Sequence, residues 1–236
     1  MERQKKMSNT VSDFLFFGAV LSLISYELGL RLKKKFKWAI FNPLLISICV
    51  VMVFLSVFHI DYKVYDKSAK YISYLLTPAT ICLAIPLYRQ MELLKKHSKA
   101  IVAGTLTGVF TTMTTVLLLA LVFGLNHQEY VTFLPKSITT AIAMGITEEM
   151  KGYVTITVAS IIITGIQGSI IAEAVCKIFK ITDPIAKGIA IGSASHAVGT
   201  TKAMEMGEIE GAMSSLAIAT SGLCTVLFAS VFSNFL

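Results

Sequence analysis

Long apolar segments alternate with short polar and basic segments along most of this chain. The longest apolar runs cover residues 14–30, 39–60, 71–87, 100–124, 153–175 and 211–232. Most of them approach the roughly 20 residues that an α-helix needs to cross a bilayer. The pattern predicts an all-α polytopic membrane protein, with residues 1–236 forming one integral-membrane domain of about seven or eight membrane segments. A mixed, charged loop is expected at 61–70.

Two prolines interrupt this apolar pattern. Thr77-Pro78 breaks the run at 71–87, and Pro135 precedes an apolar run at 136–147. As a helix, that run is only about 18 Å long, against roughly 30 Å of hydrocarbon. Threonine is a good N-cap and proline suits the first helical position, so each break predicts a half-helix that starts inside the membrane. The alternatives are a simple proline kink at Pro78 and a Lys136 that snorkels to the interface.

An internal repeat relates the two breaks. A shift of 57 residues (134 − 77) superposes 77–81 on 134–138, and it also matches Ala84-Ile85 with Ala141-Ile142, Glu92 with Glu149, and Thr107-Gly108 with Thr164-Gly165. If 136–147 is re-entrant, the repeat is inverted, as in many secondary transporters. If 136–147 crosses the membrane, the repeat is parallel. The fold expected here has interrupted half-helices and an inverted repeat, and the parallel form stays open.

A polar stretch at 192–205 stands out between apolar runs. Gly192 and Gly199 permit an unwound backbone. The stretch also supplies hydroxyls, an imidazole and an i, i+3 charge pair, from Ser193, Ser195, His196, Thr200, Thr201, Lys202 and Glu205. Polar side chains at membrane depth are costly, so they indicate either a substrate or ion site or a polar contact between helices. Glu148 and Glu149 follow the short apolar run and are either coupling groups or part of a solvated loop.

Together, these features predict one shared anion site. Half-helix N-termini attract carboxylates, and paired half-helices are the best sequence indicator of a binding site at the membrane midplane. The expected substrate-binding residues are Thr77, Pro78, Ala79, Thr80, Lys136, Ser137, Thr139, Thr140, Ser193, Ser195, His196, Gly199 and Thr200. The candidates for proton or cation coupling are Glu148, His196, Lys202 and Glu205.

The distribution of basic residues predicts how the chain is oriented in the membrane. The net charge is +7, and the basic residues gather in the loops at 31–37 and 89–99 rather than on one surface. This is a pattern of topology signals, and no nucleic-acid partner is expected. The positive-inside rule puts these loops in the cytoplasm and the loop at 125–135, which has no Lys or Arg, outside. The basic residues before Phe14 precede an expected first membrane helix rather than a cleaved signal peptide.

Several kinds of chemistry lack their motifs. The four cysteines, Cys49, Cys82, Cys176 and Cys224, lie in or beside apolar runs without metal-ligand spacing, so no metal or other cofactor is expected. No nucleotide-binding or hydrolase motif occurs, and a serine and a histidine without a recognisable base and orienter do not indicate a hydrolase. The chain is therefore not expected to be an enzyme.

The motifs resemble the LrgB/CidB family over nearly the whole chain after about residue 10. The resemblance is carried by Thr77-Pro-Ala-Thr-Ile-Cys-Leu-Ala-Ile-Pro-Leu-Tyr-Arg89, Leu134-Pro-Lys-Ser-Ile-Thr-Thr-Ala-Ile-Ala143, Ile163-Thr-Gly-Ile166, Gly192-Ser-Ala-Ser-His-Ala-Val-Gly-Thr200 and Gly211-Ala-Met-Ser-Ser215. The family's pattern is matched at 78–80, 135–137 and 195–196. It is not matched at Ala141, where proline is common, or at 148–152, where glycine is common.

The resemblance implies a multi-pass protein of the bacterial cell membrane. Bacterial family members are described as antiholin-like or holin-like proteins that modulate murein hydrolases and cell lysis with a small LrgA/CidA-type membrane partner. Related proteins carry glycolate and glycerate in plastids, or are linked to pyruvate transport. Two functions follow as expectations: a secondary transporter of small monocarboxylates, coupled to a proton or cation, or a non-transporting regulator of lysis. A homodimer is compatible with the sequence, which does not fix the oligomeric state.

Overall fold

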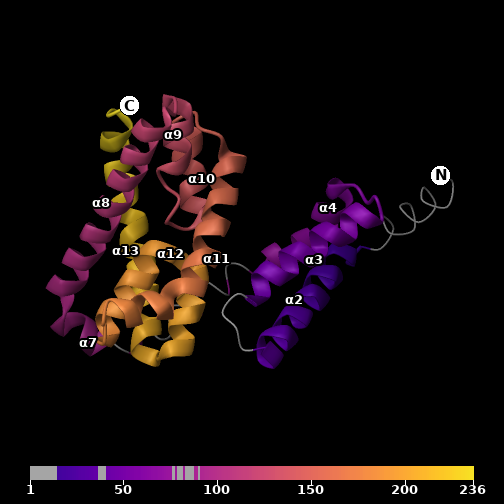
Figure 1. Cartoon of the computed structure of the whole chain (residues 1–236), viewed down its shortest axis with the longest axis horizontal. Helices are drawn as coiled ribbons and strands as arrows, with labels where there is room; N and C mark the ends of the chain where they lie inside the picture. The colour runs from indigo at the N-terminus through magenta and orange to yellow at the C-terminus, as the bar shows by residue number, and fades with distance from the viewer. Residues whose placement is uncertain (1–14, 37–40, 76–77, 79–81, 83–87, 90) are drawn as a thin grey trace. The chain divides into compact units, whose positions relative to one another are not determined.

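The computed structural model describes residues 15–36, 41–75, 78, 82, 88–89 and 91–236. Every regular element named in this part of the chain is a helix, as the apolar pattern predicts. The chain divides into two compact units, Met1–Cys82 and Leu83–Leu236, and each has its own internal packing (Figure 1).

The first unit contains α2 (Phe17–Phe36), α3 (Pro43–Val57) and α4 (Tyr62–Ser73). Helix α3 starts where Asn42 caps it, with the side-chain oxygen accepting a hydrogen bond from the Leu44 amide at 2.9 Å. The prediction of a loop at 61–70 is wrong, because these residues form most of helix α4, which Asp61 caps. Ser68 of α4 is buried and accepts a hydrogen bond from the Gly18 amide at 2.8 Å. A search for apolar runs misses such a helix because most of its residues are polar and only one side packs.

Part of the predicted binding site falls outside the described residues. Thr77, Ala79 and Thr80 lie there, together with most of the predicted span at 71–87 and the repeat residues Ala84-Ile85. Of the first predicted break, only Pro78 is described, in an exposed position.

The second unit contains α7 (Met91–Lys96), α8 (Ser98–Phe123), α9 (His127–Phe133), α10 (Thr140–Glu149), α11 (Val154–Ile178), α12 (Pro184–Met206) and α13 (Glu208–Ser233). Within the described residues, α8, α11 and α13 are long and apolar enough to cross a membrane. They confirm the runs at 100–124, 153–175 and 211–232 as helices of sufficient length. In Figure 1, α7 lies at one end of α8, and α9 and the C-terminus lie at the other.

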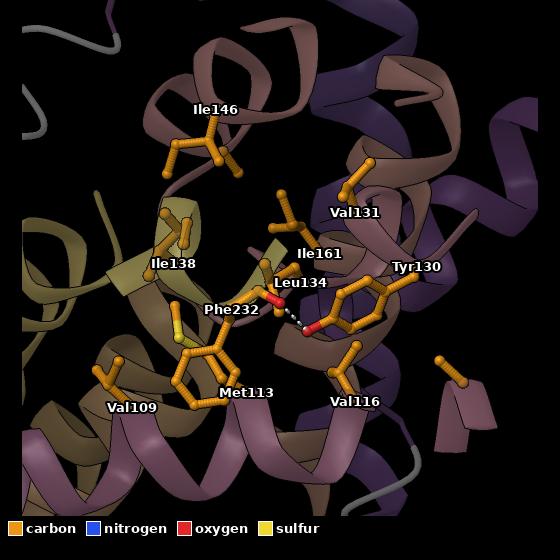
Figure 2. Packing of buried hydrophobic residues seen from close by; sticks show 13 residues of the cluster. Val109, Met113, Val116, Tyr130, Val131, Leu134, Ile138, Ile146, Ile161 and Phe232 are labelled. Carbon is orange, nitrogen blue, oxygen red and sulfur yellow. Dashed lines mark hydrogen bonds between the residues drawn. The ribbon is translucent and has the colours of Figure 1, made fainter. Parts of the chain in front are cut away.

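The main core of this unit lies where α8, α11 and α13 meet the α9–α10 segment. Tyr130 of α9 is fully buried among apolar side chains, and its hydroxyl donates a 2.9 Å hydrogen bond to the Phe232 carbonyl (Figure 2). A buried phenol needs such a partner, because an unpaired hydroxyl in an apolar core is costly. This bond ties α9 to the C-terminal end of α13.

Helices α9 and α10 form a hairpin that leaves one end of the unit and returns to it. Gln128, at the start of α9, donates to the Lys151 carbonyl at 2.9 Å, and Thr132 accepts from the Tyr153 amide at 2.8 Å. The turn between the helices is deeply buried, with Leu134 1% and Ile138 2% exposed. We call His127–Glu149 the first hairpin.

The start of the short helix differs from the prediction. The sequence predicts a helix over 136–147, whereas the structure has turns at 134–137 and starts α10 at Thr140, ending it at Glu149. The Lys136 amide bonds to the Phe133 carbonyl at 3.2 Å, and the Ile138 amide bonds to the Pro135 carbonyl at 3.4 Å. Thr139, in an extended conformation, caps the helix instead of Pro135. These two turn hydrogen bonds occupy the backbone at 133–138, so the helix starts after them, at an N-cap residue whose side chain makes no capping hydrogen bond.

Helix α12 is two helical arms joined at His196, the one residue inside it with non-helical angles, φ 42° and ψ −140°. A β-carbon on Gly199 would lie 3.2 Å from the Ile191 carbonyl oxygen. Eight residues of straight helix would separate these positions by about 12 Å. Ile191 and Ala203 also share one apolar cluster. The chain therefore folds back at His196, and we call Pro184–Met206 the second hairpin, with arms at 184–195 and 197–206.

The two hairpins start from opposite ends of α11. The first hairpin ends just before Val154, where α11 begins, and the second begins just after Ile178, where α11 ends. Because α11 is a single helix of 25 residues, its two ends lie at opposite ends of the second unit. The two hairpins therefore enter the unit from opposite ends. Their tips approach each other in its interior, next to α8 and α13.

Candidate functional site

A small enclosed cavity lies where the two hairpins approach each other. Its volume is about 10 Å³, close to the space that one water needs. It is lined by the polar residues Thr112, Ser137, Ser193 and Thr225 and by Val109, Met113, Leu134, Pro135 and Ile138. Ser137, Ser193 and Thr225 are buried and Thr112 is half-buried, so four hydroxyl-bearing residues gather here in a largely apolar setting.

Ser137 and Pro135 reach the cavity from the tip of the first hairpin. Both are buried, and they lie in the turn that precedes α10. Lys136 lies between them in the chain and is half-buried, but it is not part of the cavity wall. Thr139 and Thr140 follow at the start of α10, also half-buried and also away from the cavity wall.

Ser193 reaches the same cavity from the second hairpin. It sits against Gly108 of α8, where a β-carbon would lie 2.8 Å from the Ser193 hydroxyl oxygen. This hydroxyl donates to the Ile189 carbonyl at 2.8 Å, and its oxygen can also accept. The structure thus brings two of the predicted binding residues, Ser137 and Ser193, to one site.

The tip of the second hairpin is turned toward α11. His196 is buried, and its Nε2 lies 2.9 Å from the Ile161 carbonyl oxygen. The ring occupies the space that a side chain on Gly165 would fill. Ser195 likewise packs on Gly168, where an added β-carbon would overlap its hydroxyl. These two glycines allow α11 and the tip of the second hairpin to approach closely.

The remaining polar residues of 192–205 connect the second hairpin to its neighbours. The Thr200 hydroxyl bonds to the His196 carbonyl at 2.9 Å and to the Ser214 hydroxyl of α13 at 2.7 Å. Gly199 is buried against the opposite arm of the hairpin. Neither residue is part of the cavity wall. The polar stretch therefore contacts three neighbouring helices: Ser193 contacts α8, Ser195 and His196 contact α11, and Thr200 contacts α13.

The predicted i, i+3 pair of Lys202 and Glu205 is confirmed, at 3.4 Å. Lys202 also pairs with Glu173 of α11, which holds the base of the second hairpin to that helix. Glu148 and Glu149 lie exposed in the last turn of α10. Neither of these two glutamates is part of the cavity wall.

A larger cleft, of about 760 Å³, opens at the base of the second hairpin. Its wall combines lysines and glutamates from the end of α11, both ends of α12 and the start of α13. The sequence does not reveal this cleft. In a predicted loop, Lys177, Lys180 and Lys187 indicate only the side of the membrane on which that loop lies. Only the reversal at His196 brings both ends of α12 to one place.

A second feature not recognised in the sequence is the motif Gly188-Ile-Ala-Ile-Gly192. In this G-x-x-x-G spacing, both glycines face one side of a helix and allow a second helix to approach closely. A β-carbon on Gly192 would lie 2.3 Å from the Ser214 carbonyl oxygen, and one on Gly188 would lie 2.5 Å from the Glu210 carbonyl oxygen. The motif sets the contact between the second hairpin and α13, and its spacing is a signal by which it could have been found.

Comparison with known proteins places these features in a family. The LrgB-like family model matches residues 22–235, which includes both hairpins. The chain is 36% identical over 231 residues to the antiholin-like protein LrgB of Bacillus mycoides (strain KBAB4), covering 98% of this chain and 100% of that protein. The same figures hold for proteins of the same name from Bacillus cereus (strain B4264) and Bacillus anthracis (strain CDC 684 / NRRL 3495). No solved structure matches the chain. With nearly its whole length matched, this membrane protein belongs to the LrgB-like family.

Proposed function

We propose that the chain is a secondary transporter of small monocarboxylates such as pyruvate and glycolate. One observation carries the proposal: two hairpins from opposite ends of α11 bring Ser137 and Ser193 to one buried polar cavity. Helical segments that are broken inside the membrane and meet at a polar centre are typical of transporter binding sites. Hydroxyl groups suit a carboxylate because they donate hydrogen bonds to its oxygens.

In the proposed cycle, the structure corresponds to a closed state. A cavity of about 10 Å³ holds one water, so a three-carbon carboxylate can enter only after a hairpin moves. Movement of the first hairpin would open the cavity to one side, and movement of the second would open it to the other. The Ser193 hydroxyl, which donates to the Ile189 carbonyl in the closed state, would then rotate to donate to the substrate. Lys136 and His196 would approach the anion only after such a movement.

The same proposal extends to the membrane architecture. The inverted repeat of 77–81 and 134–138 remains part of the proposal, and it is supported only by analogy: the two hairpins enter from opposite ends of α11, as paired broken segments do in transporters with inverted repeats. Such a chain would have about seven or eight segments in the bacterial cell membrane, with the two hairpins counted among them although they enter and leave on one side.

Proton or cation coupling is also part of this proposal. Ser193 lines the cavity, whereas His196, three residues later, contacts α11 instead. The imidazole would therefore carry a proton near the site rather than form part of its wall. Lys202 and Glu205 are ion-paired at the base of the second hairpin, and they would respond to its movement. Glu148, exposed at the end of α10, would act only from the surface.

A second function is favoured by the printed name of the relatives, antiholin-like. In this alternative, the chain does not transport, but binds a small LrgA/CidA-type membrane protein and thereby regulates murein hydrolases and lysis. The two functions are compatible if lysis responds to carboxylate flux. The inner cavity distinguishes the two functions, because a transporter must bind its substrate there, whereas a protein that only regulates lysis need not.

Reconstitution tests transport directly. The purified chain in liposomes, with and without the small partner, is expected to accumulate labelled pyruvate or glycolate above empty liposomes. Ser193→Ala should lower this uptake at least about tenfold, because a hydrogen bond to a charged group is lost. Thr201→Ala, at an exposed position of the same helix, is the matched control and should leave uptake unchanged. Uptake equal to that of empty liposomes under all conditions would refute transport and leave the regulator.

A further inference from the structure

The cleft of about 760 Å³ at the base of the second hairpin has the size of a ligand site. Three consecutive helices supply its charged wall: Glu173 and Lys177 belong to α11 and Lys180 follows it, Lys187 and Glu205 belong to the two arms of α12, and Glu210 belongs to α13. The cleft belongs to the second unit and is distinct from the small cavity at the hairpin tips.

The three glutamates of the cleft already have cationic neighbours. Glu173 and Glu205 both pair with Lys202, the latter at 3.4 Å. Glu210 lies 4.0 Å from Lys187. It also folds back toward Gly207, where α13 begins, and the positive end of a helix stabilises a carboxylate. The negative charge of the wall is thus largely compensated.

The lysines on the α11 side of the cleft have no such compensation. No ion pair reaches Lys177 or Lys180 from any residue that the structure describes. Lys180 follows the C-terminus of α11 with φ 53°, a conformation that a glycine would adopt at less cost, and its amide donates to the Lys177 carbonyl at 3.2 Å. Both side chains border the cleft, so its uncompensated charge is positive.

We propose that this cleft is an anion-binding vestibule, in which Lys177 and Lys180 hold a small carboxylate before the second hairpin opens. That the anion is a carboxylate rests on the proposed transport function. That the cleft binds an anion rests only on its uncompensated lysines. A single oxyanion is the shared chemistry of a free carboxylate and a lipid phosphodiester. The carboxylate is the ligand proposed here, because the second hairpin lines this cleft and also places Ser193 in the wall of the inner cavity, where the proposed substrate binds.

A thiol reporter tests the charge of the cleft without any transport assay. Cys49, Cys82, Cys176 and Cys224 are replaced by alanine, and Thr182→Cys puts an exposed thiol in the cleft wall. An anionic methanethiosulfonate is expected to react about fivefold faster than a cationic one, relative to a free thiol, because the local potential is positive. Lys177→Gln with Lys180→Gln should remove this preference. Lys151→Gln, outside the cleft, is the matched control.

Protection experiments then identify the anion. Pyruvate is expected to slow modification of the reporter in detergent and in phosphatidylcholine vesicles, and the double lysine variant should lose this protection. Protection by anionic lipid alone, without an effect of pyruvate, would assign the cleft to lipid headgroups and overturn the proposal. Equal rates for the two reagents would overturn the anion site altogether. A positive charge preference with no uptake in liposomes would keep the anion site and refute only transport.

Discussion

Gly192→Leu is expected to separate the second hairpin from α13 and to abolish uptake. A β-carbon at this position would already lie 2.3 Å from the Ser214 carbonyl oxygen and 2.8 Å from the Ala217 β-carbon. The first of these atoms belongs to the backbone of a long helix, so it cannot move aside as a side chain can. We expect a loss of about 3 kcal/mol or more in stability, at the upper end of the cost of overpacking. Thermal unfolding in detergent and liposome uptake measure the two effects.

Gly145→Leu is the matched control for this substitution. Gly145 lies in α10, and no atom lies within 4 Å of an added β-carbon. Leucine should gain about 0.5–1 kcal/mol from helix propensity and leave uptake intact. If Gly192→Leu unfolds at the temperature of the parent protein, the close contact between the second hairpin and α13 is wrong.

His196 is expected to be needed for its imidazole as well as for its place at the hairpin tip. With φ 42° and ψ −140°, it occupies a conformation that glycine adopts readily and that costs other residues about 1–3 kcal/mol. His196→Ala keeps this strain and loses the bond to the Ile161 carbonyl, which is worth about 1 kcal/mol. His196→Gly loses the same bond but relieves the strain.

The two variants therefore separate stability from function. His196→Gly should unfold at a higher temperature than His196→Ala, whereas uptake should fall at least about tenfold in both, because neither has an imidazole. Uptake that follows stability, with the glycine variant close to the parent protein, would make His196 a purely structural residue. Melting curves and uptake rates on the same preparations distinguish these results.

The long helices can be predicted from the sequence because apolar length alone determines them. The close packing at Gly165 and Gly168 is predictable too, since small residues within apolar helices permit close approach. Helix α4 is not, because its polar surface hides it from a search for apolar runs. An unwound backbone is expected at Gly192 or Gly199, whereas the reversal occurs at His196.

The hairpin reversal explains most of what the sequence could not reveal. A histidine in a glycine-like conformation is stabilised by tertiary contacts with Ile161 and Gly165, which no local pattern displays. Without that reversal, Lys187 and Glu205 would lie about 27 Å apart, as 18 residues of straight helix require. With it, they border one cleft. The same reversal decides which residues of the polar stretch reach the inner cavity.

Reversible cross-linking of the hairpin tips tests whether the inner cavity must open for transport. Ser137→Cys and Ser193→Cys, in a background without the native cysteines, place two thiols on the wall of one cavity. We expect the reduced protein to keep a lowered but measurable uptake, because a thiol at position 193 is a weak hydrogen-bond donor in place of the hydroxyl. A short bifunctional thiol reagent should lower that uptake at least about tenfold further, and reductant should restore it. Each single-cysteine variant, treated in the same way, controls for modification alone. Unchanged uptake in fully cross-linked protein would show that the substrate does not pass between the two hairpins.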